Sequence, residues 1–107
     1  MTTLTLNPYN FQIASIWDDN GETYIEVEVF PDLYVTVKYP NCTTEQVVAR
    51  VQADKSPYSY PMQNEDGGYV YDADSQGSSV AEISEDDAWD VVQFVDDVLY
   101  ESGDLYL

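Results

Sequence analysis

Two tight turns that separate runs of alternating residues constrain the fold of this chain most. Residues 18–21 read Asp-Asp-Asn-Gly and residues 31–32 read Pro-Asp, and Asn-Gly supplies the positive φ of a tight hairpin. Between the two turns, apolar residues alternate with Glu26 and Glu28, as in a strand with one buried face. Residues 9–39 are therefore predicted to form an antiparallel three-stranded meander.

The apolar residues of these strands define the face that is expected to enter the core. In residues 9–17 the alternation assigns one side to Tyr9, Phe11, Ile13 and Trp17, and the other side, expected to be partly buried, to Ala14 and Ile16. The core face of the second strand consists of Ile25, Val27 and Val29, and that of the third consists of Leu33, Val35, Val37 and Tyr39. Helices packed on this face would complete the core.

Two helices are predicted after the meander, each from its capping sequence. Thr43 and Gln46 fit a capping box that begins a short helix ending near residue 54. Ser84, followed by three acids, caps a long C-terminal helix that ends near residue 102. The apolar stripe of this long helix consists of Ala88, Val92, Val95 and Leu99, widened by Val91 and Val98.

A second, shorter hairpin is expected between the helices. Residues 69–71 and 80–83 are short strand-like segments on either side of the polar loop 72–79. Together the elements predict a single α+β domain over residues 1–107, an antiparallel β-sheet packed with one short and one long C-terminal helix. Hydrophobic residues (44%) and aromatic residues (14%) are abundant enough for a core, unlike in disordered acidic chains.

The sequence predicts a cytoplasmic protein. Its lone Cys42 excludes an internal disulfide, so no feature points to an oxidising compartment. The N-terminal residues contain neither a basic segment nor a long apolar run, so neither a signal peptide nor a membrane span is expected.

The charge of the chain is large and lopsided. Its formal net charge is −18, from 21 acids and 3 cations. The cations are Lys38, Arg50 and Lys55, so residues 56–107 carry 13 acids and no cation. One-sided charge destabilises a compact state, and it repels nucleic acids and anionic membranes. The partner that this charge predicts is a basic nucleic-acid-binding protein or nuclease complex.

The long C-terminal helix carries the most regular part of this charge. Asp86, Asp90, Asp97 and Glu101 recur at spacings of four, seven and four, so they share one helix face. Seven acids in residues 85–101 give one carboxylate per about 4 Å of helix axis, close to the roughly 3.4 Å between phosphates of one DNA strand. The predicted partner-binding residues are Glu85, Asp86, Asp87, Asp90, Asp96, Asp97, Tyr100, Glu101 and Asp104, with Glu26 and Glu28 on the sheet.

The position of the helix decides whether these acids form one surface. If the helix covers the face of the sheet opposite to Glu26 and Glu28, these two residues form a separate patch. If Glu26 and Glu28 instead lie at the edge of the helix, the acidic surface is continuous.

No enzyme activity, metal or cofactor is predicted. The chain has no His, and its three cations are too scattered to clamp a phosphate. Residues 72–77 resemble the start of a calcium loop, but position 12 of that loop is Ile83, where Glu is needed. With 21 acids, some carboxylate pair lies at any given distance, so such a pair is no specific sign of a hydrolase.

In its small size, strong acidity and ten tyrosines the chain resembles the DNA-mimic proteins encoded by phages and mobile elements. These include anti-restriction proteins, acidic anti-CRISPR proteins and uracil-DNA glycosylase inhibitors. The resemblance covers the whole chain and lies in composition and charge layout, not in a motif. It implies that carboxylates displace phosphates from a basic channel of a host defence nuclease, a CRISPR-type nuclease ahead of a restriction-type one. Exposed rings such as Tyr100 would contact Arg side chains.

Two other classes of protein fit the same composition. An immunity protein or antitoxin is also small and acidic, and it plugs a basic toxin nuclease. A housekeeping domain from a halophile carries acids evenly over its surface and folds only in high salt.

Overall fold

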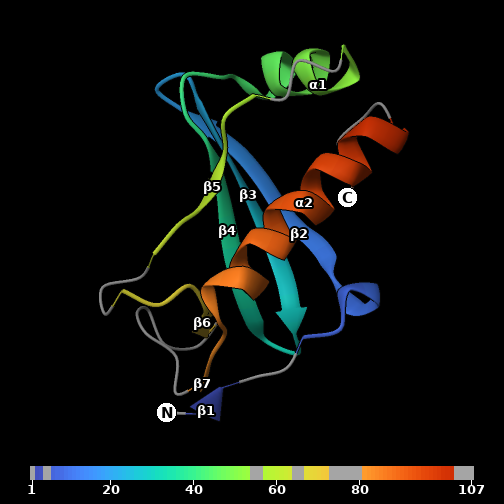
Figure 1. Ribbon diagram of the computed structural model, residues 1–107. Coiled ribbons are helices and arrows are strands. Elements are labelled where there is room, and N and C mark those ends of the chain that lie inside the picture. Colours follow the sequence, from blue (N-terminus) through green and yellow to red (C-terminus); the bar gives the residue numbers. More distant parts are fainter. Residues whose placement is uncertain (1, 4–5, 54–56, 64–66, 73–80, 103–107) are drawn as a thin grey trace.

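A three-stranded antiparallel meander forms the centre of the fold (Figure 1), which confirms the prediction. Its strands are β2 (Gln12–Asp19), β3 (Glu22–Phe30) and β4 (Leu33–Tyr39). Asn20 and Gly21 have φ angles of 52° and 77°, the positive values expected of an Asn-Gly turn. The computed structural model describes residues 2–3, 6–53, 57–63, 67–72 and 81–102.

The first strand begins three residues later than predicted. Pro8–Asn10 form a short 3-10 turn, η1, so β2 starts at Gln12. The Tyr9 side chain is 96% exposed, whereas Phe11 is buried. The prediction that Tyr9 faces the core is therefore wrong, because the turn lifts this residue off the sheet.

A β-bulge in β2 reverses the predicted faces of its second half. The pairing with β3 shifts register between Ile13 and Ser15, which inserts one extra residue. Ile16 consequently packs against the core. Trp17 lies on the opposite face of the sheet, where its ring stacks on Tyr24 at 5.5 Å between centroids. The assignment of Trp17 to the core face was wrong for this reason.

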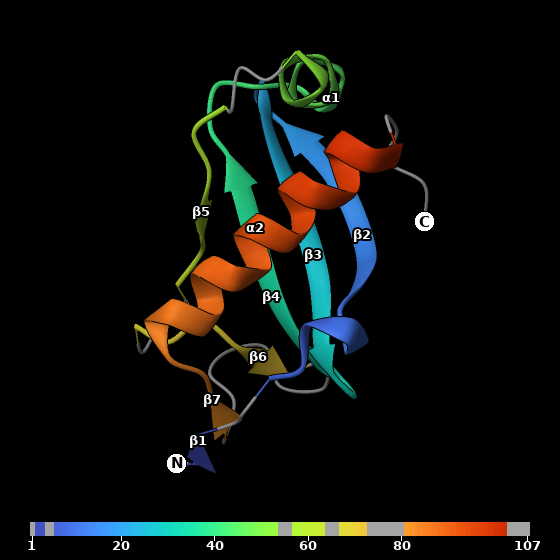
Figure 2. The same cartoon turned by 45° about the vertical axis from the view of Figure 1, so that its right-hand side comes forward.

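Both predicted helices are present. α1 (Thr44–Gln52) lies at one end of the meander, and its capping box is formed by the side chains of Thr43 and Gln46. α2 (Glu85–Ser102) crosses one face of the sheet diagonally (Figure 2). The Ser84 hydroxyl caps α2 by accepting the Asp87 N–H at 3.2 Å. The chain is thus an α+β domain with helices packed on an antiparallel sheet.

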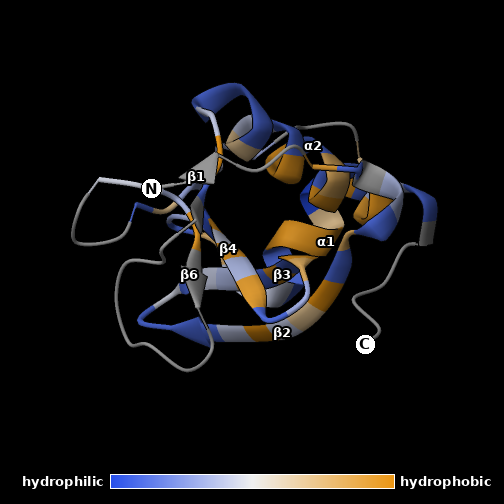
Figure 3. Ribbon diagram, turned by 90° about the horizontal axis from the view of Figure 1, so that it is seen from below, coloured by the Kyte–Doolittle hydropathy of each residue, from blue (hydrophilic) through white to orange (hydrophobic). Residues whose placement is uncertain are grey.

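The core lies between α2 and the sheet. Every second residue of β3 and β4 faces α2, and apolar residues recur in both layers (Figure 3). Fully buried side chains from the sheet include Ile25, Val27, Val35, Val37 and Tyr39, and those from α2 include Ala88, Val91, Val95 and Leu99. This core fixes which side of α2 faces solvent.

The described residues of the predicted second hairpin, 69–72 and 81–83, do not pair with each other in a sheet. β6 (Tyr71–Asp72) pairs antiparallel with β4, and β7 (Ala81–Glu82) pairs parallel with β1 (Thr2–Thr3). β4 takes up a further strand, β5 (Tyr60–Pro61), along the same edge. β5 and β6 thereby form hydrogen bonds with the edge of β4 that does not pair with β3, so this edge is not left open.

One carboxylate keeps the two segments of that expected hairpin close together. Glu82 Oε1 accepts the N–H groups of Tyr69, Val70 and Ile83 at 2.8, 3.0 and 3.1 Å. Val70 and Ile83 are buried. This carboxylate therefore holds the backbone of residues 69–70 against residues 82–83, directly before α2 begins. No helix among the described residues has both the length and the apolar character that a bilayer crossing needs.

Candidate functional site

The solvent-facing side of α2 presents a line of carboxylates. Asp86, Asp90, Asp97 and Glu101 are all exposed, directly opposite the buried stripe of the helix. Their predicted alignment on one face is therefore confirmed. We call these four residues the acidic stripe. None of them is paired with a Lys or Arg in the part of the chain that the structure describes.

The acidic stripe is interrupted and flanked by uncharged polar and aromatic residues. Gln93 lies between Asp90 and Asp97, and its Nε2 donates to Asp97 Oδ1 at 2.9 Å. Tyr100 is 55% exposed and lies one residue before Glu101. Aligned like charges of this kind are unfavourable, and an acid in the last turn also opposes the helix dipole.

Asp96 lies at the contact between helix and sheet, not in the acidic stripe. Its Oδ1 accepts a hydrogen bond from the Tyr39 hydroxyl at 2.5 Å, and its side chain is only partly accessible. Burial raises the pKa of Asp96, the Tyr39 hydrogen bond opposes this, and the charge of Asp97 adds to it. Burial and then the bond to Asp96 also hold the pKa of Tyr39 above its usual range. Asp96 thus joins α2 to the end of β4.

The remaining predicted residues of α2 differ in exposure. Glu85 is exposed, whereas Asp87 is partly buried beside the N-cap. Five exposed carboxylates then span Glu85 to Glu101, a length of about 24 Å at roughly 1.5 Å per residue. Their mean spacing is about 6 Å, compared with roughly 3.4 Å between phosphates of one DNA strand. The spacing of about 4 Å expected from sequence counts all seven carboxylates, of which Asp87 and Asp96 are only partly exposed.

The sheet acids form a separate patch. Glu26 and Glu28 alternate with Ile25, Val27 and other core residues of β3, so they point away from α2. Burial and then the charges of Glu28 and Asp32 raise the pKa of Tyr34. α2 covers one face of the sheet (Figure 2) and Glu26 and Glu28 belong to the other face, so this second acidic patch and the acidic stripe do not form one continuous surface.

The described cations are engaged elsewhere. The Lys38 ammonium on the outer face of the sheet lies 3.5 Å from Glu22 Oε1 and 5.5 Å from the centre of the Tyr24 ring. Arg50 Nη1 donates to Cys42 Sγ at 3.1 Å. These contacts leave the charge of the acidic stripe unbalanced by the described cations.

Some sequence-based expectations fall outside the described residues. Asp104 is one of them, and residues 73–77 of the calcium-like loop are others. Within the described ranges, no group of three or more acidic or Cys side chains is arranged to hold a metal ion.

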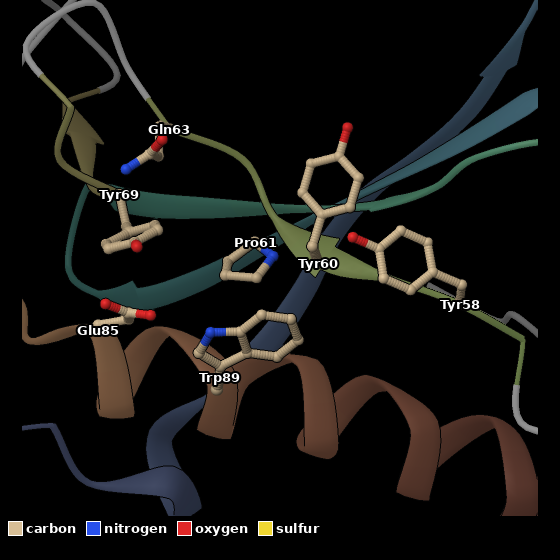
Figure 4. Close-up of a pocket in the computed structure, with 7 residues that line it drawn as sticks. All are labelled: Tyr58, Tyr60, Pro61, Gln63, Tyr69, Glu85 and Trp89. Carbon is tan, nitrogen blue, oxygen red and sulfur yellow. The ribbon is translucent and has the colours of Figure 1, made fainter.

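A groove lined by aromatic residues, which no sequence pattern predicted, lies beside the start of α2 (Figure 4). Its volume is about 230 Å³. Tyr58 and Tyr60 lie at one end, Pro61 and Trp89 in the middle, and Gln63, Tyr69 and Glu85 at the other end. We call this the aromatic groove. The alternation Tyr58-Ser59-Tyr60 was the one available signal of an edge strand in this segment.

No protein family model, curated protein or solved structure matches this chain. Its function is therefore inferred from its own geometry. A rigid helix anchored by its apolar face presents fixed negative charges to solvent, and such an arrangement attracts and orients a positively charged surface.

Proposed function

We propose that this protein is a DNA-mimic inhibitor that occupies the positively charged nucleic-acid-binding channel of a host defence nuclease. CRISPR-type nucleases are the first targets to test, and restriction-type nucleases the second. The observation that carries the proposal is the acidic stripe: Asp86, Asp90, Asp97 and Glu101 are exposed on one face of α2 without a described cationic partner.

The anchoring of α2 supports this role. Ala88, Val91, Val95 and Leu99 are fully buried against the sheet, so the helix cannot rotate without exposing its core face. A carboxylate that is fixed before binding loses less conformational freedom on association than one on a flexible segment. The rigid acidic stripe is therefore better suited to competition with a nucleic acid than a disordered acidic tail would be.

The absence of compensating charges also supports it. A helix selected only for solubility gains stability from Glu–Lys pairs at i, i+4, each worth about 0.2–0.5 kcal/mol. α2 places Asp86 before Asp90 and Asp97 before Glu101 at this spacing, so it has repulsion where a pair would stabilise it. A binding role for the face explains why this unfavourable arrangement is retained.

Under this proposal the mechanism is occlusion. The exposed carboxylates on α2 are spaced more widely than phosphates, so they would meet Arg and Lys side chains of the channel at selected positions. The contacts would be strongly salt-dependent because both partners are charged and solvent-accessible before binding. DNA and inhibitor would then exclude each other from one channel.

The proposal is tested by competition with labelled DNA. The protein is titrated into a panel of CRISPR effector complexes and restriction enzymes at low salt, and the bound fraction of a fluorescent duplex is followed by anisotropy. Displacement that weakens with added salt is expected for at least one target. If every complex retains its DNA at saturating protein, the proposed function is wrong.

A further inference from the structure

The aromatic groove exposes rings that a folded chain would normally bury. Trp89 is 44% exposed and Tyr58 is 68% exposed, although both are large and aromatic. The rings of Tyr58 and Tyr60 lie 5.7 Å apart at an angle of 39°. In Figure 4, Trp89 rises from α2 towards Pro61, and Tyr58 lies beside it on the approach to β5. Two aromatic faces thus border one opening.

The same groove contains a carboxylate. Glu85 lies one helical turn before Trp89, is exposed, and points into the groove on the side of Tyr69. None of the described residues that line the groove is Lys or Arg. Aromatic faces attract cations through their quadrupoles, and a nearby carboxylate adds a direct charge interaction. The groove therefore favours a cationic group over a neutral or anionic one.

The outer face of the sheet already contains this combination of groups within the chain. Lys38 lies 5.5 Å from the centre of the Tyr24 ring and 3.5 Å from Glu22 Oε1. A ring and a carboxylate there hold one ammonium group together. Trp89 and Glu85 offer a ring and a carboxylate in the same way. Lys38 lies against Tyr60 at the other end of the groove, and no described cation pairs with Glu85 or lies over the Trp89 ring, so the cation at these two residues must come from another molecule.

The size and shape of the groove indicate which cation. A volume of about 230 Å³ lies below the range of roughly 300–1,000 Å³ typical of sites for drug-sized ligands, so one side chain is a suitable occupant. A guanidinium group is planar, stacks on aromatic faces and binds a carboxylate through two parallel hydrogen bonds. An ammonium group is more strongly hydrated and does none of this as well.

From these observations we infer that the aromatic groove binds an arginine side chain of the basic partner. The guanidinium would stack against Trp89 and pair with Glu85, and Tyr58, at the other end of the groove, would contact the rest of the arginine side chain. This inference rests on the proposed function, since it names the group that a nucleic-acid-binding partner would insert. It adds a position-specific contact to the long-range attraction of the acidic stripe.

Nuclear magnetic resonance of the full chain tests the inference directly. The protein has two Trp residues, so its spectrum contains two indole N–H signals, which a Trp17→Phe variant assigns. The probe is the tripeptide acetyl-Gly-Arg-Gly-amide, and the neutral citrulline analogue is its control. Saturable shifts of the Trp89 signal by the arginine peptide are expected, with smaller shifts of Trp17 and at least about fivefold weaker binding of the citrulline peptide.

Two matched variants separate the groove from the general negative field. Glu85→Gln and Asp90→Asn each remove one exposed carboxylate from α2, but only Glu85 lines the groove. Glu85→Gln should weaken peptide binding several-fold, and Asp90→Asn by less than about twofold. Tyr58→Ala, at the end of the groove opposite Glu85, should weaken binding by less than Glu85→Gln does. Equal effects of the two acid variants, or equal binding of both peptides, would overturn the inference.

The outcome is separable from that of the proposed function. If the arginine peptide binds but no nuclease loses its DNA, the groove is a guanidinium site and the proposed function fails. If a nuclease is inhibited but the peptide does not shift Trp89, the inference about the groove fails and occlusion by the acidic stripe stands.

Discussion

Replacing both Asp90 and Glu101 by Lys should raise the free energy of unfolding. The same double replacement should abolish the inhibition proposed for the acidic stripe. Asp86 and Asp90 lie at i, i+4, as do Asp97 and Glu101, and all four are exposed. Each replacement exchanges a repulsive pair for an attractive one with the acid on the N-terminal side, worth about 0.4–1 kcal/mol. Lys at position 101 also complements the C-terminal end of the helix dipole, by about 0.3–1 kcal/mol.

Together these changes predict a gain of about 1–2 kcal/mol in the free energy of unfolding at low salt, allowing for incomplete additivity. For a chain of this length, the melting temperature should rise by about 4–16 °C. Thermal unfolding is followed by circular dichroism at 10 mM and at 1 M NaCl. The gain should shrink at high salt, where the Debye length falls to about 3 Å.

A matched control distinguishes local repulsion from net charge. Asp90→Lys/Glu101→Lys and Asp18→Lys/Asp19→Lys each change the formal net charge by four units, from −18 to −14. Asp18 and Asp19 are exposed at the end of β2, not on α2, and Asp18 Oδ2 accepts a long hydrogen bond, 3.5 Å, from the Thr44 hydroxyl. The helix variant should be stabilised more than the strand variant. An unchanged or lower melting temperature for the helix variant at low salt would refute the reasoning that the acidic stripe is under repulsion.

Three further predictions concern the framework that holds the acidic stripe. Burial raises the pKa of Asp96, so its carboxylate binds a proton more readily in the folded state than in the unfolded state. The stability of the protein therefore rises as the pH falls from above this raised pKa towards 3.8, the ordinary pKa of an Asp side chain. Asp96→Asn, which can still accept from Tyr39, should therefore melt above the parent protein at pH 7, and the difference should shrink towards pH 4; a constant difference would contradict this assignment. Thr43→Ala removes the N-cap of α1 and should cost about 0.5–2 kcal/mol in urea unfolding, whereas no loss would mean that the cap contributes nothing. Glu82→Ala leaves the N–H groups of Tyr69, Val70 and Ile83 without this acceptor and should speed their hydrogen exchange, whereas Glu82→Gln should preserve most of the protection.

The elements with strong local signals could be predicted from the sequence. The turn at Asn20-Gly21 and the clean alternation of β3 and β4 determine the meander, because register is fixed when one face must be buried. The capping residues Thr43 and Ser84 place both helix starts. The acidic stripe could be predicted because helical periodicity assigns a face to each residue.

The parts that depend on tertiary packing could not be predicted in the same way. The bulge between Ile13 and Ser15 has no Gly to mark it, so Trp17 was assigned to the wrong face. β6 and β7 are two residues long, too short for a periodic pattern, and their partners were decided by the open edge of β4 and by β1.

The placement of Asp96 was within reach of the sequence. It lies four residues after Val92 and three before Leu99, and both of these are buried. A carboxylate at this flank of the apolar stripe therefore points towards the sheet edge. The aromatic groove, in contrast, combines β5 with the first turns of α2, and no local pattern indicates that these segments meet.

Competition between this protein and labelled DNA for a nuclease is the most direct test of its proposed role. The parent protein, Asp90→Lys/Asp97→Lys/Glu101→Lys, and the strand control Asp18→Lys/Asp19→Lys are titrated into the same nuclease–DNA complex at low salt. DNA should be displaced by the parent and by the strand control, but not by the folded helix variant. Equal displacement by all three would contradict a role for the acidic stripe, and no displacement by the parent from any defence nuclease would contradict DNA mimicry itself.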